Sequence, residues 1–170
     1  MNDEICIITT GGTIDKVYFD AKGGYEVGAT MVRGILEHAR VLEPVSIVEL
    51  LRKDSLDMTA ADRAAIRAAI IASPARRVLV THGTDTMVET ARELLDIGGK
   101  TIVLTGALQP GRMSDSDAPF NLGLAFGALK SRGPGVFIAA NGHIFDATAV
   151  RKNRELNRFE AVDPQAKGRS

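Results

Sequence analysis

The stretch ICIITTGGTID, residues 5–15, decides the fold of this chain. Its first four residues, 5–8, are apolar, too few for a helix and without strict alternation, which predicts a parallel strand buried on both faces. Gly11 and Gly12 then allow a tight turn and a close approach of the backbone to a ligand. Thr13 is therefore expected on a loop at the carboxyl end of the strand, where open α/β sheets bind their ligands.

A second stretch repeats this plan. Residues 78–80 are an apolar run, residues 81–85 are polar with one glycine, and residues 86–89 have the pattern of a capping box at the start of a helix. Thr84 and Asp85 are therefore expected at the same edge of the sheet, close to a helix N-terminus. Two hydroxyl-bearing loops facing one crevice indicate a nucleophile and the group that activates it.

The rest of the chain alternates between helical and extended patterns. Further strands are expected at residues 45–48, 101–104 and 136–139, helices at 30–40, 59–73, 87–97 and 117–133, and hairpins at 15–25 and 143–150. The crossovers are long enough for parallel pairing, so the chain is predicted to be α/β, a three-layer sandwich with a mostly parallel, doubly wound sheet. Residues 1–160 are assigned to this single domain and residues 161–170 to a polar tail.

Composition excludes some classes of partner. Among 170 residues, lysine plus arginine and aspartate plus glutamate both number 21, so no global field attracts nucleic acid or a membrane. The basic run Arg151, Lys152, Arg154 and Arg158 has, taken alone, the pattern of a solvated face. The single cysteine, Cys6, lies in the first apolar run and is expected to be a buried, inert thiol. Without a signal peptide or a long apolar segment, the protein is predicted to be cytoplasmic.

Three ordered motifs carry a family resemblance. TTGGTID (residues 9–15), VTHGTDTM (80–87) and AVRKN (149–153) resemble the two threonine signatures and the lysine of the bacterial-type L-asparaginases. KDSLDM (53–58), VLTGALQP (103–110) and SDAPFNLG (116–123) resemble that family as well, in its order along nearly the whole chain. The resemblance implies hydrolysis of L-asparagine to L-aspartate and ammonia through a threonine acyl-enzyme, with no metal and no cofactor.

The resemblance also assigns catalytic roles. Thr13 takes the place of the threonine that attacks the side-chain amide, and Thr84, Lys152 and Asp85 take the places of a relay that follows Ser-His-Asp logic with other side chains. To accept a proton, Lys152 has to be buried enough to disfavour its ammonium form. Like charges on neighbouring arginines, Arg151 and Arg154, would help. On pattern alone, Thr13 is a turn residue and Lys152 a surface lysine.

A lid is implied by the segment around Tyr25, which resembles the segment with the family's catalytic tyrosine. As a hypothesis, the Tyr25 phenol contacts Thr13 only when the loop closes and excludes water. Tyr18 is the internal competitor for this role and ranks below Tyr25. Without the resemblance, both tyrosines read as ordinary packing of a hairpin.

The resemblance also implies which residues contact the substrate. By this resemblance, Asp85 binds the α-ammonium group of the substrate and Ser55 donates to its α-carboxylate, while backbone groups near Thr84 and Ala107 contact the oxyanion or the leaving group. Leu56 stands where some relatives have glutamine, which leaves the preference between asparagine and glutamine open. The full set of expected contacts is Gly12, Ser55, Gly83, Thr84, Asp85 and Ala107.

Several alternatives stay open from the residues. His82 is expected to be a structural residue rather than the general base, and His38 and His143 do not suggest a metal cluster. The chain could be a non-catalytic module that binds asparagine or aspartate, or an amidohydrolase for glutamine, a D-amino acid or an amide in a larger substrate. Typical asparaginases continue into a second, smaller domain, which this chain lacks, so an open pocket and self-association into a homo-oligomer are expected.

Overall fold

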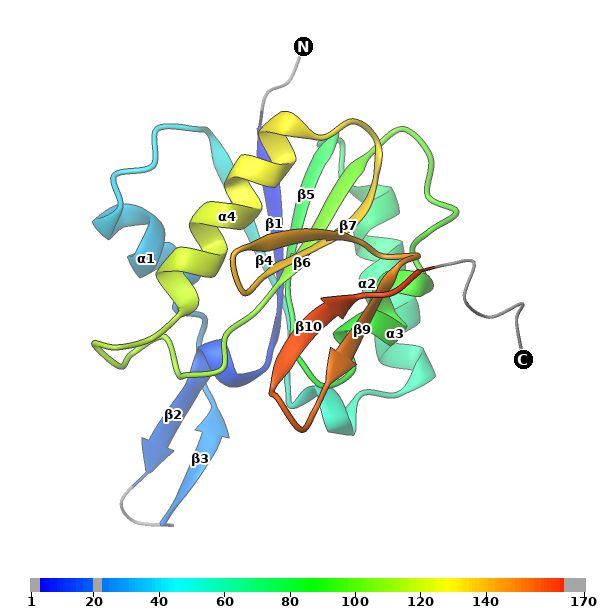
Figure 1. The fold of residues 1–170 in the computed structure, drawn as a ribbon. Helices are drawn as coiled ribbons and strands as arrows, with labels where there is room; N and C mark the ends of the chain where they lie inside the picture. Colours follow the sequence, from blue (N-terminus) through cyan, green and yellow to red (C-terminus); the bar gives the residue numbers. More distant parts are fainter. Residues whose placement is uncertain (1–3, 20–22, 164–170) are drawn as a thin grey trace, which may run out of the picture.

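The computed structural model describes residues 4–19 and 23–163, which form a single α/β unit around a six-stranded sheet. The strands of this sheet are β1 (Ile5–Gly11), β4 (Val45–Lys53), β5 (Arg77–Thr81), β6 (Thr101–Thr105), β7 (Gly135–Ala140) and β8 (His143–Asp146). They lie in the order β4-β1-β5-β6-β7-β8, and all neighbours pair in parallel except β7 and β8 (Figure 1). The predicted mostly parallel sheet is therefore confirmed.

Helices cover both faces of the sheet. One face carries α1 (Val32–His38) and α4 (Ala118–Ser131), and the other carries α2 (Ala60–Ala72) and α3 (Met87–Arg92) (Figure 1). A hydrophobic core lies on each face of the sheet, and alternate residues of β1 point into one or the other. Ile5 and Ile7 pack with α1 and α4, whereas Cys6 and Ile8 pack with α2 and α3. The three-layer sandwich and the burial of β1 on both faces are confirmed.

The order of the strands predicts where a ligand-binding crevice lies in this fold. The chain runs from β1 to its neighbour β4 and then crosses back over β1 to β5, so the order reverses at β1. The crevice beyond the carboxyl ends of β1 and β5 is therefore a topological switch point, where doubly wound sheets bind ligands. Thr13 follows β1 and Thr84 follows β5, so both signature loops lie at this edge.

Helix starts differ in how they are capped. The Thr59 side chain and the Asp62 side chain satisfy each other's backbone N–H groups in a complete capping box at the start of α2. The predicted capping box at residues 86–89 is wrong, because the Thr86 side chain makes no cap bond and donates instead to the Ser55 carbonyl, 2.8 Å away. The helix predicted for residues 87–97 is also shorter, since α3 ends at Arg92 and turns follow.

Two hairpins extend from the sheet. The predicted hairpin at residues 15–25 is present as β2 (Lys16–Phe19) and β3 (Gly24–Val27). The hairpin predicted for residues 143–150 is wrong: β8 turns back onto β7, and the second hairpin pairs β9 (Val150–Asn153) with β10 (Arg158–Ala161). Positive φ angles at Asn141 and Gly142 explain the tight return onto β7. The predicted tail therefore begins inside β10, and residues 164–170 lie outside the described residues.

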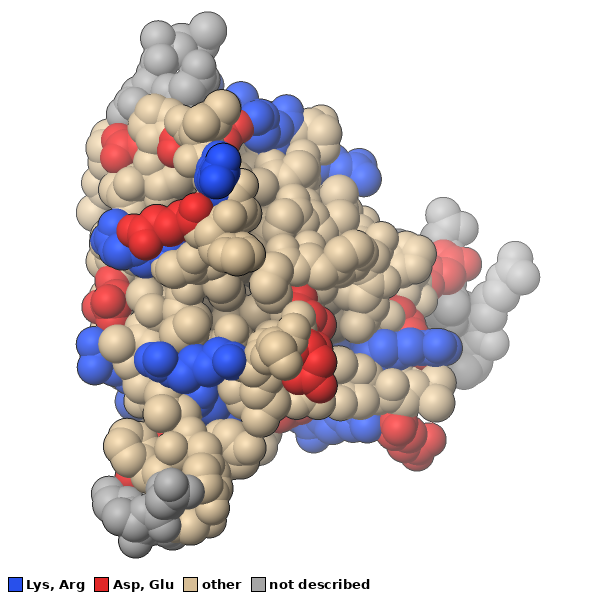
Figure 2. Space-filling model, turned by 90° about the vertical axis from the view of Figure 1, so that its left-hand side faces the viewer, with Lys and Arg blue, Asp and Glu red and all other residues tan. Residues whose placement is uncertain are grey.

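The surface has no field of one sign on the face that carries α1 and α4. Figure 2 shows basic and acidic side chains interspersed there, with a wide band of uncharged surface between them. This agrees with the balanced count of 21 cationic and 21 acidic residues. Within the described ranges, no helix is long and apolar enough to cross a membrane.

Candidate active site

The loop that carries Thr13 lies against the loop that carries Thr84. Gly11 and Gly12 have φ angles of 99° and 82°, a region that favours glycine, and Thr13 begins a short 3-10 turn, Thr13–Asp15. A Cβ atom added to Gly12 would lie 2.5 Å from the backbone nitrogen of Gly83. Only glycine at position 12 therefore allows the two loops to pack this closely.

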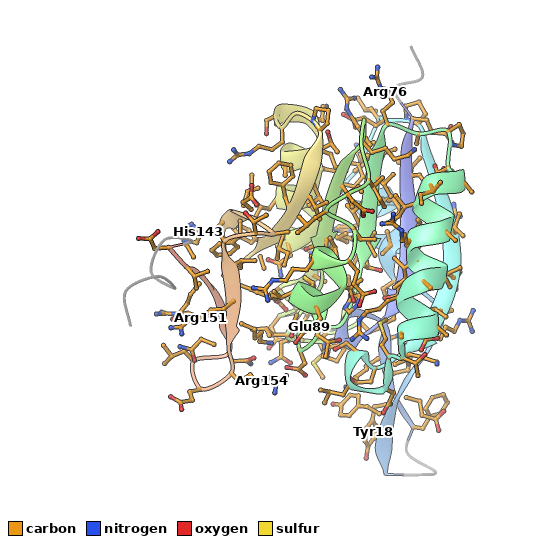
Figure 3. The ribbon with its side chains drawn as sticks, turned by 90° about the vertical axis from the view of Figure 1, so that its right-hand side faces the viewer. Tyr18, Arg76, Glu89, His143, Arg151 and Arg154 are labelled. Atoms are coloured by element: carbon orange, nitrogen blue, oxygen red, sulfur yellow. The ribbon has the colours of Figure 1, made fainter. Side chains whose placement is uncertain are left out.

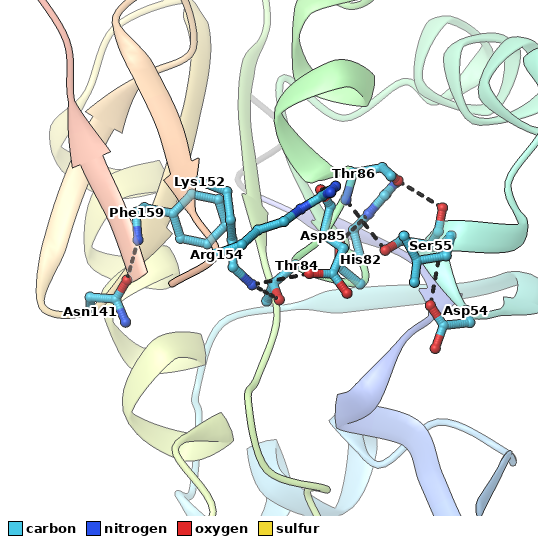
Figure 4. Close-up of polar contacts among 12 residues, drawn as sticks. Asp54, Ser55, His82, Thr84, Asp85, Thr86, Asn141, Lys152, Arg154 and Phe159 are labelled. Atoms are coloured by element: carbon cyan, nitrogen blue, oxygen red, sulfur yellow. Dashed lines mark hydrogen bonds and ion pairs between the residues drawn. The ribbon is translucent and has the colours of Figure 1, made fainter. Parts of the chain in front are cut away.

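Lys152 reaches the second loop from far along the chain. Its Nζ atom donates to the hydroxyl Oγ1 of Thr84 at 2.5 Å and lies 3.5 Å from Oδ1 of Asp85 (Figure 4). Strand β9 positions the side chain, and Nζ also lies 5.6 Å from the ring centroid of Phe159 on β10. The structure thus brings together Thr84, Asp85 and Lys152, three of the five predicted catalytic residues.

The environment of Lys152 shifts its proton affinity. The side chain is only 5 % exposed, and burial lowers its pKa below the ordinary lysine value, while Asp85 opposes the shift and Arg154 adds to it. The expected help from Arg154 is supported, because its positive charge is one of the causes that lower the Lys152 pKa; its guanidinium donates to the Asp85 carbonyl at 3.4 Å. Arg151 is occupied differently, in an ion pair with Glu160. A buried lysine beside a hydroxyl can take its proton.

Ser55 lies under the second loop. The side chain is buried, its hydroxyl oxygen accepts a weak bond from the Thr86 backbone N–H at 3.4 Å, and a Cβ atom on Gly83 would approach it to 2.6 Å. Asp54 is a loop-capping group, because its carboxylate accepts from the Leu56 N–H at 3.1 Å. The Leu56 side chain itself is exposed.

His82 is a structural residue. Its ring is fully buried, with Nδ1 2.7 Å from the Gly83 carbonyl and Nε2 2.8 Å from the Thr90 hydroxyl. Burial is the main cause that lowers its pKa to about 4, so the ring is neutral across the physiological range. The Nε2 contact ties the second loop to α3 and the Nδ1 contact lies within that loop, so both ring nitrogens have partners, which supports the expectation that His82 is not the general base.

Tyr25 is on β3 and is not brought to the other catalytic candidates. Its side chain is 51 % exposed, and its ring packs edge-on against Tyr18, with centroids 5.3 Å apart. The two residues face each other across the hairpin, which projects beyond the carboxyl edge of the sheet (Figure 1). Contact between Tyr25 and Thr13 would therefore require the hairpin to move toward the crevice.

Sequence reasoning missed the role of Asp117. Its carboxylate accepts the backbone N–H groups of Leu108 and Gln109 at 3.0 Å, and Asn121 donates to the Gly106 carbonyl at 2.9 Å. These contacts hold the turn that carries Ala107, whose side chain is buried. The sequence marked Asp117 only as a helix start, whereas its side chain makes no helix cap and clamps a loop of the crevice instead.

Comparison with known proteins shows the family of the chain. Residues 4–169 match the family model described as "Asparaginase, N-terminal". The chain belongs to the asparaginase family. A relative named "Probable L-asparaginase periplasmic", from Haemophilus influenzae, is 31 % identical over 160 residues, which cover 87 % of this chain and 46 % of the relative.

Solved structures of asparaginases share the fold. The thermostable L-asparaginase from Thermococcus kodakarensis matches with a TM-score of 0.79 and 26 % identity, over 93 % of this chain and 51 % of that chain. A structure titled "Probable Cytoplasmic L-asparaginase from Campylobacter jejuni" matches with a TM-score of 0.78 and 31 % identity, over 93 % and 53 %. This asparaginase-family chain thus spans about half the length of the relatives it matches.

Asp15 is a second residue whose role the sequence did not reveal. It follows Thr13 by two residues and is 2 % exposed. Its Oδ1 atom accepts from the Met31 N–H at 2.9 Å and from the Thr30 hydroxyl at 3.2 Å, and its backbone carbonyl accepts from Gly28 at 2.8 Å. Asp15 therefore ties both ends of the β2-β3 hairpin to the Thr13 turn.

Replacing Asp15 with asparagine is expected to stabilise the protein at alkaline pH. Burial is the main cause that raises the Asp15 pKa from 3.8 to about 6; the hydrogen bonds from Met31 and Thr30 oppose the shift, Glu49 adds to it slightly, and Arg112 opposes it slightly. Because the Asp15 pKa is higher in the folded than in the unfolded protein, protonated Asp15 costs the fold nothing below pH 3.8, the unfolded pKa. The free energy of unfolding then decreases as pH rises through 6, the folded pKa. The amide keeps an acceptor oxygen, so the gain at pH 8 is about 1–3 kcal/mol and is largely absent at pH 4.

Urea unfolding at both pH values measures this effect. The matched control is Asp15→Ala, which leaves the Met31 N–H without its acceptor and is expected to be less stable than Asp15→Asn. An asparagine variant whose stability follows the wild-type pH dependence would contradict the assignment of the raised pKa to Asp15.

Proposed function

We propose that this chain is an L-asparaginase, which hydrolyses L-asparagine to L-aspartate and ammonia through an ester on Thr13. The observation that carries the proposal is the contact of Lys152 with Thr84 and Asp85, at the crevice that the Thr13 loop borders. A module that only binds asparagine would not need a buried lysine against a hydroxyl. This contact therefore favours catalysis over simple binding.

In the first step, the Thr13 hydroxyl attacks the carbon of the side-chain amide and the Thr84–Lys152 pair accepts its proton. The carbon–nitrogen bond breaks, and the nitrogen leaves as ammonia with a proton returned by the pair. In the second step, water attacks the ester, gives a proton to the same pair, and Thr13 leaves as the restored hydroxyl. Backbone N–H groups of the two glycine loops are proposed to stabilise the oxyanion of each step.

Substrate binding is proposed to use both loops. The Asp85 carboxylate is 41 % exposed and available to an α-ammonium group, and the buried Ser55 hydroxyl is proposed to donate to the α-carboxylate. Gly12, Gly83, Thr84 and Ala107 complete the proposed contacts through the loops that carry them. With leucine at position 56, the chain lacks a side-chain hydrogen bond there, so the relative rates on asparagine and glutamine have to be measured.

Assembly and location remain proposals. A second copy of the chain is proposed to cover the crevice, where the Asp85 carboxylate is still 41 % exposed. The expected cytoplasmic location stays a prediction, since one relative is named periplasmic and one cytoplasmic.

Ammonia release by the purified protein tests the proposal. L-Asparagine, L-glutamine and D-asparagine are supplied in parallel, and release is expected to be fastest from L-asparagine. If no amide releases ammonia while L-asparagine raises the melting temperature, the chain is a binding module and the proposal fails.

The lid hypothesis has a matched pair of variants. Tyr25→Phe removes the phenol that the hypothesis places against Thr13 and is expected to lower kcat about 10²-fold, the lower end for a group that assists proton transfer. Tyr18→Phe removes the hydroxyl of the facing tyrosine, a residue of similar exposure, and is expected to leave kcat within about twofold. Equal decreases of kcat in the two variants would contradict the assignment of Tyr25 as the catalytic tyrosine of the lid.

A further inference from the structure

A cationic cleft lies directly beside the proposed reaction centre. It has a volume of about 440 Å³, within the range of ligand pockets, and is bounded by α3 on one side and by the β9-β10 hairpin on the other. Its lining residues are Asp85, Val88, Glu89, Arg92, Arg151, Lys152 and Arg154. Because Asp85 and Lys152 also belong to the catalytic cluster, the cleft is continuous with that cluster.

The basic run of the sequence is therefore not only a solvated face. Arg151 and Arg154 lie on the hairpin across from α3, which carries Glu89 (Figure 3). Arg92, on α3, donates to the Val150 carbonyl at 3.3 Å and so joins the two walls of the cleft. The chain has no net charge as a whole, yet four of its cationic side chains gather here. Such a concentration attracts anions.

The charges in the cleft are only partly balanced. Lys152 is paired with Asp85, and Arg151 is paired with Glu160. Toward the described residues 4–19 and 23–163, Arg92 and Arg154 each donate through one nitrogen, to a backbone carbonyl, whereas a guanidinium group has five N–H donors. The carboxylate of Glu89, which also lines the cleft, balances one of these two positive charges. The remaining charge of about one unit suits a single carboxylate, which guanidinium groups bind through paired hydrogen bonds.

We propose that this cleft binds a carboxylate of the substrate that lies beyond the reacting amide, so that the preferred substrate is larger and more acidic than free asparagine. The proposal rests on the proposed amidohydrolase function. A substrate anchored at Asp85 by its α-ammonium group has the cleft immediately beside it, because Asp85 lines that cleft. In an asparagine followed by an acidic residue, the peptide carbonyl replaces the α-carboxylate as the acceptor for Ser55, and the acidic side chain is the group proposed to bind Arg92 and Arg154.

A pair of dipeptides tests the proposal. Asparaginyl-glutamate and asparaginyl-leucine share the reacting amide and the free α-amino group, and differ in the side-chain carboxylate. Wild type is expected to show a kcat/KM at least tenfold higher for asparaginyl-glutamate. In the double variant R92Q/R154Q this ratio is expected to fall to about one. The ratio cancels any general loss of rate, which matters because Arg154 also affects the pKa of Lys152.

R76Q is the matched control, because Arg76 is exposed at the opposite end of the molecule from Arg154 (Figure 3). This variant is expected to keep the wild-type ratio. Equal kcat/KM values for the two dipeptides in the wild type, or a ratio that survives in R92Q/R154Q, would overturn the proposal. So would an effect of free succinate on asparagine hydrolysis without any preference between the dipeptides, because the carboxylate would then belong to a separate effector.

Binding of succinate separates failure of the cleft from failure of the proposed function. The probe is followed by NMR through the Nε–Hε signals of the arginines. If no amide releases ammonia, shifts at Arg92 and Arg154 that weaken at least fivefold in each single variant, R92Q or R154Q, would still support the anion site. Unmoved arginine signals would overturn the anion site whatever the enzyme activity.

Discussion

Thr13→Ala is expected to lower ammonia release from L-asparagine about 10⁴-fold or more, because it removes the atom that forms the ester. Losses of this size are typical when the nucleophile of a covalent mechanism is removed. The folded state is expected to change little, since Thr13 lies on a loop whose course is set by Gly12 and its bond to the Lys53 carbonyl, 2.9 Å away. Steady-state ammonia release and the melting temperature, measured on the same preparation, check both parts.

Two further threonine variants sharpen this result. Thr13→Ser keeps a hydroxyl and is expected to retain more activity than Thr13→Ala. Thr148→Ala removes an exposed hydroxyl that bonds to Asp146 in the turn before β9 and makes no bond to Thr84, Asp85 or Lys152, and it is expected to leave the rate within about twofold. Activity of Thr13→Ala close to that of wild type would remove Thr13 from the mechanism.

Lys152→Met is expected to lower kcat/KM about 10³-fold, within the range for loss of a general base. Methionine keeps much of the apolar stem that packs toward Phe159, but it cannot take a proton from Thr84. The matched control is Lys130→Met, since Lys130 is an exposed lysine on α4 that pairs with Glu43 outside the catalytic cluster. Equal rates for Lys152→Met and Lys130→Met would refute the relay.

The pH profile tests the same group independently. Lys152 acts as a base only when neutral, so activity is expected to fall as pH decreases through its pKa. Burial and Arg154 lower this pKa, so that a larger neutral fraction is present near neutral pH than for an ordinary lysine. Arg154→Gln removes one of these causes and is expected to move the acidic limb of the kcat/KM profile to higher pH. An acidic limb at the same pH in Arg154→Gln would contradict the assignment of that limb to Lys152.

The sequence predicted the two loops well because their signals are local. An apolar run followed by glycine and threonine specifies a buried strand and a turn within about ten residues, and both β1 and β5 end as expected. These features depend on residues that are neighbours in the chain.

Long-range features needed the resemblance or were missed. Lys152 is 68 residues from Thr84, and its pattern alone indicated a surface lysine. Its position depends on the pairing of β9 with β10, which the expected hairpin at residues 143–150 did not contain. The clamp made by Asp117 and the tie made by Asp15 depend on side chains that bond to the backbone of other loops. Periodicity carries no signal for such bonds.

The attack of Thr13 on the substrate can be observed directly by mass spectrometry. Wild-type protein is mixed with L-asparagine, quenched with acid during turnover and digested. The account predicts an aspartyl group on the peptide that contains Thr13, and its absence in Thr13→Ala. An aspartyl group on Thr84, or steady ammonia release with Thr13 unmodified under conditions where hydrolysis of the ester limits the rate, would contradict the central claim.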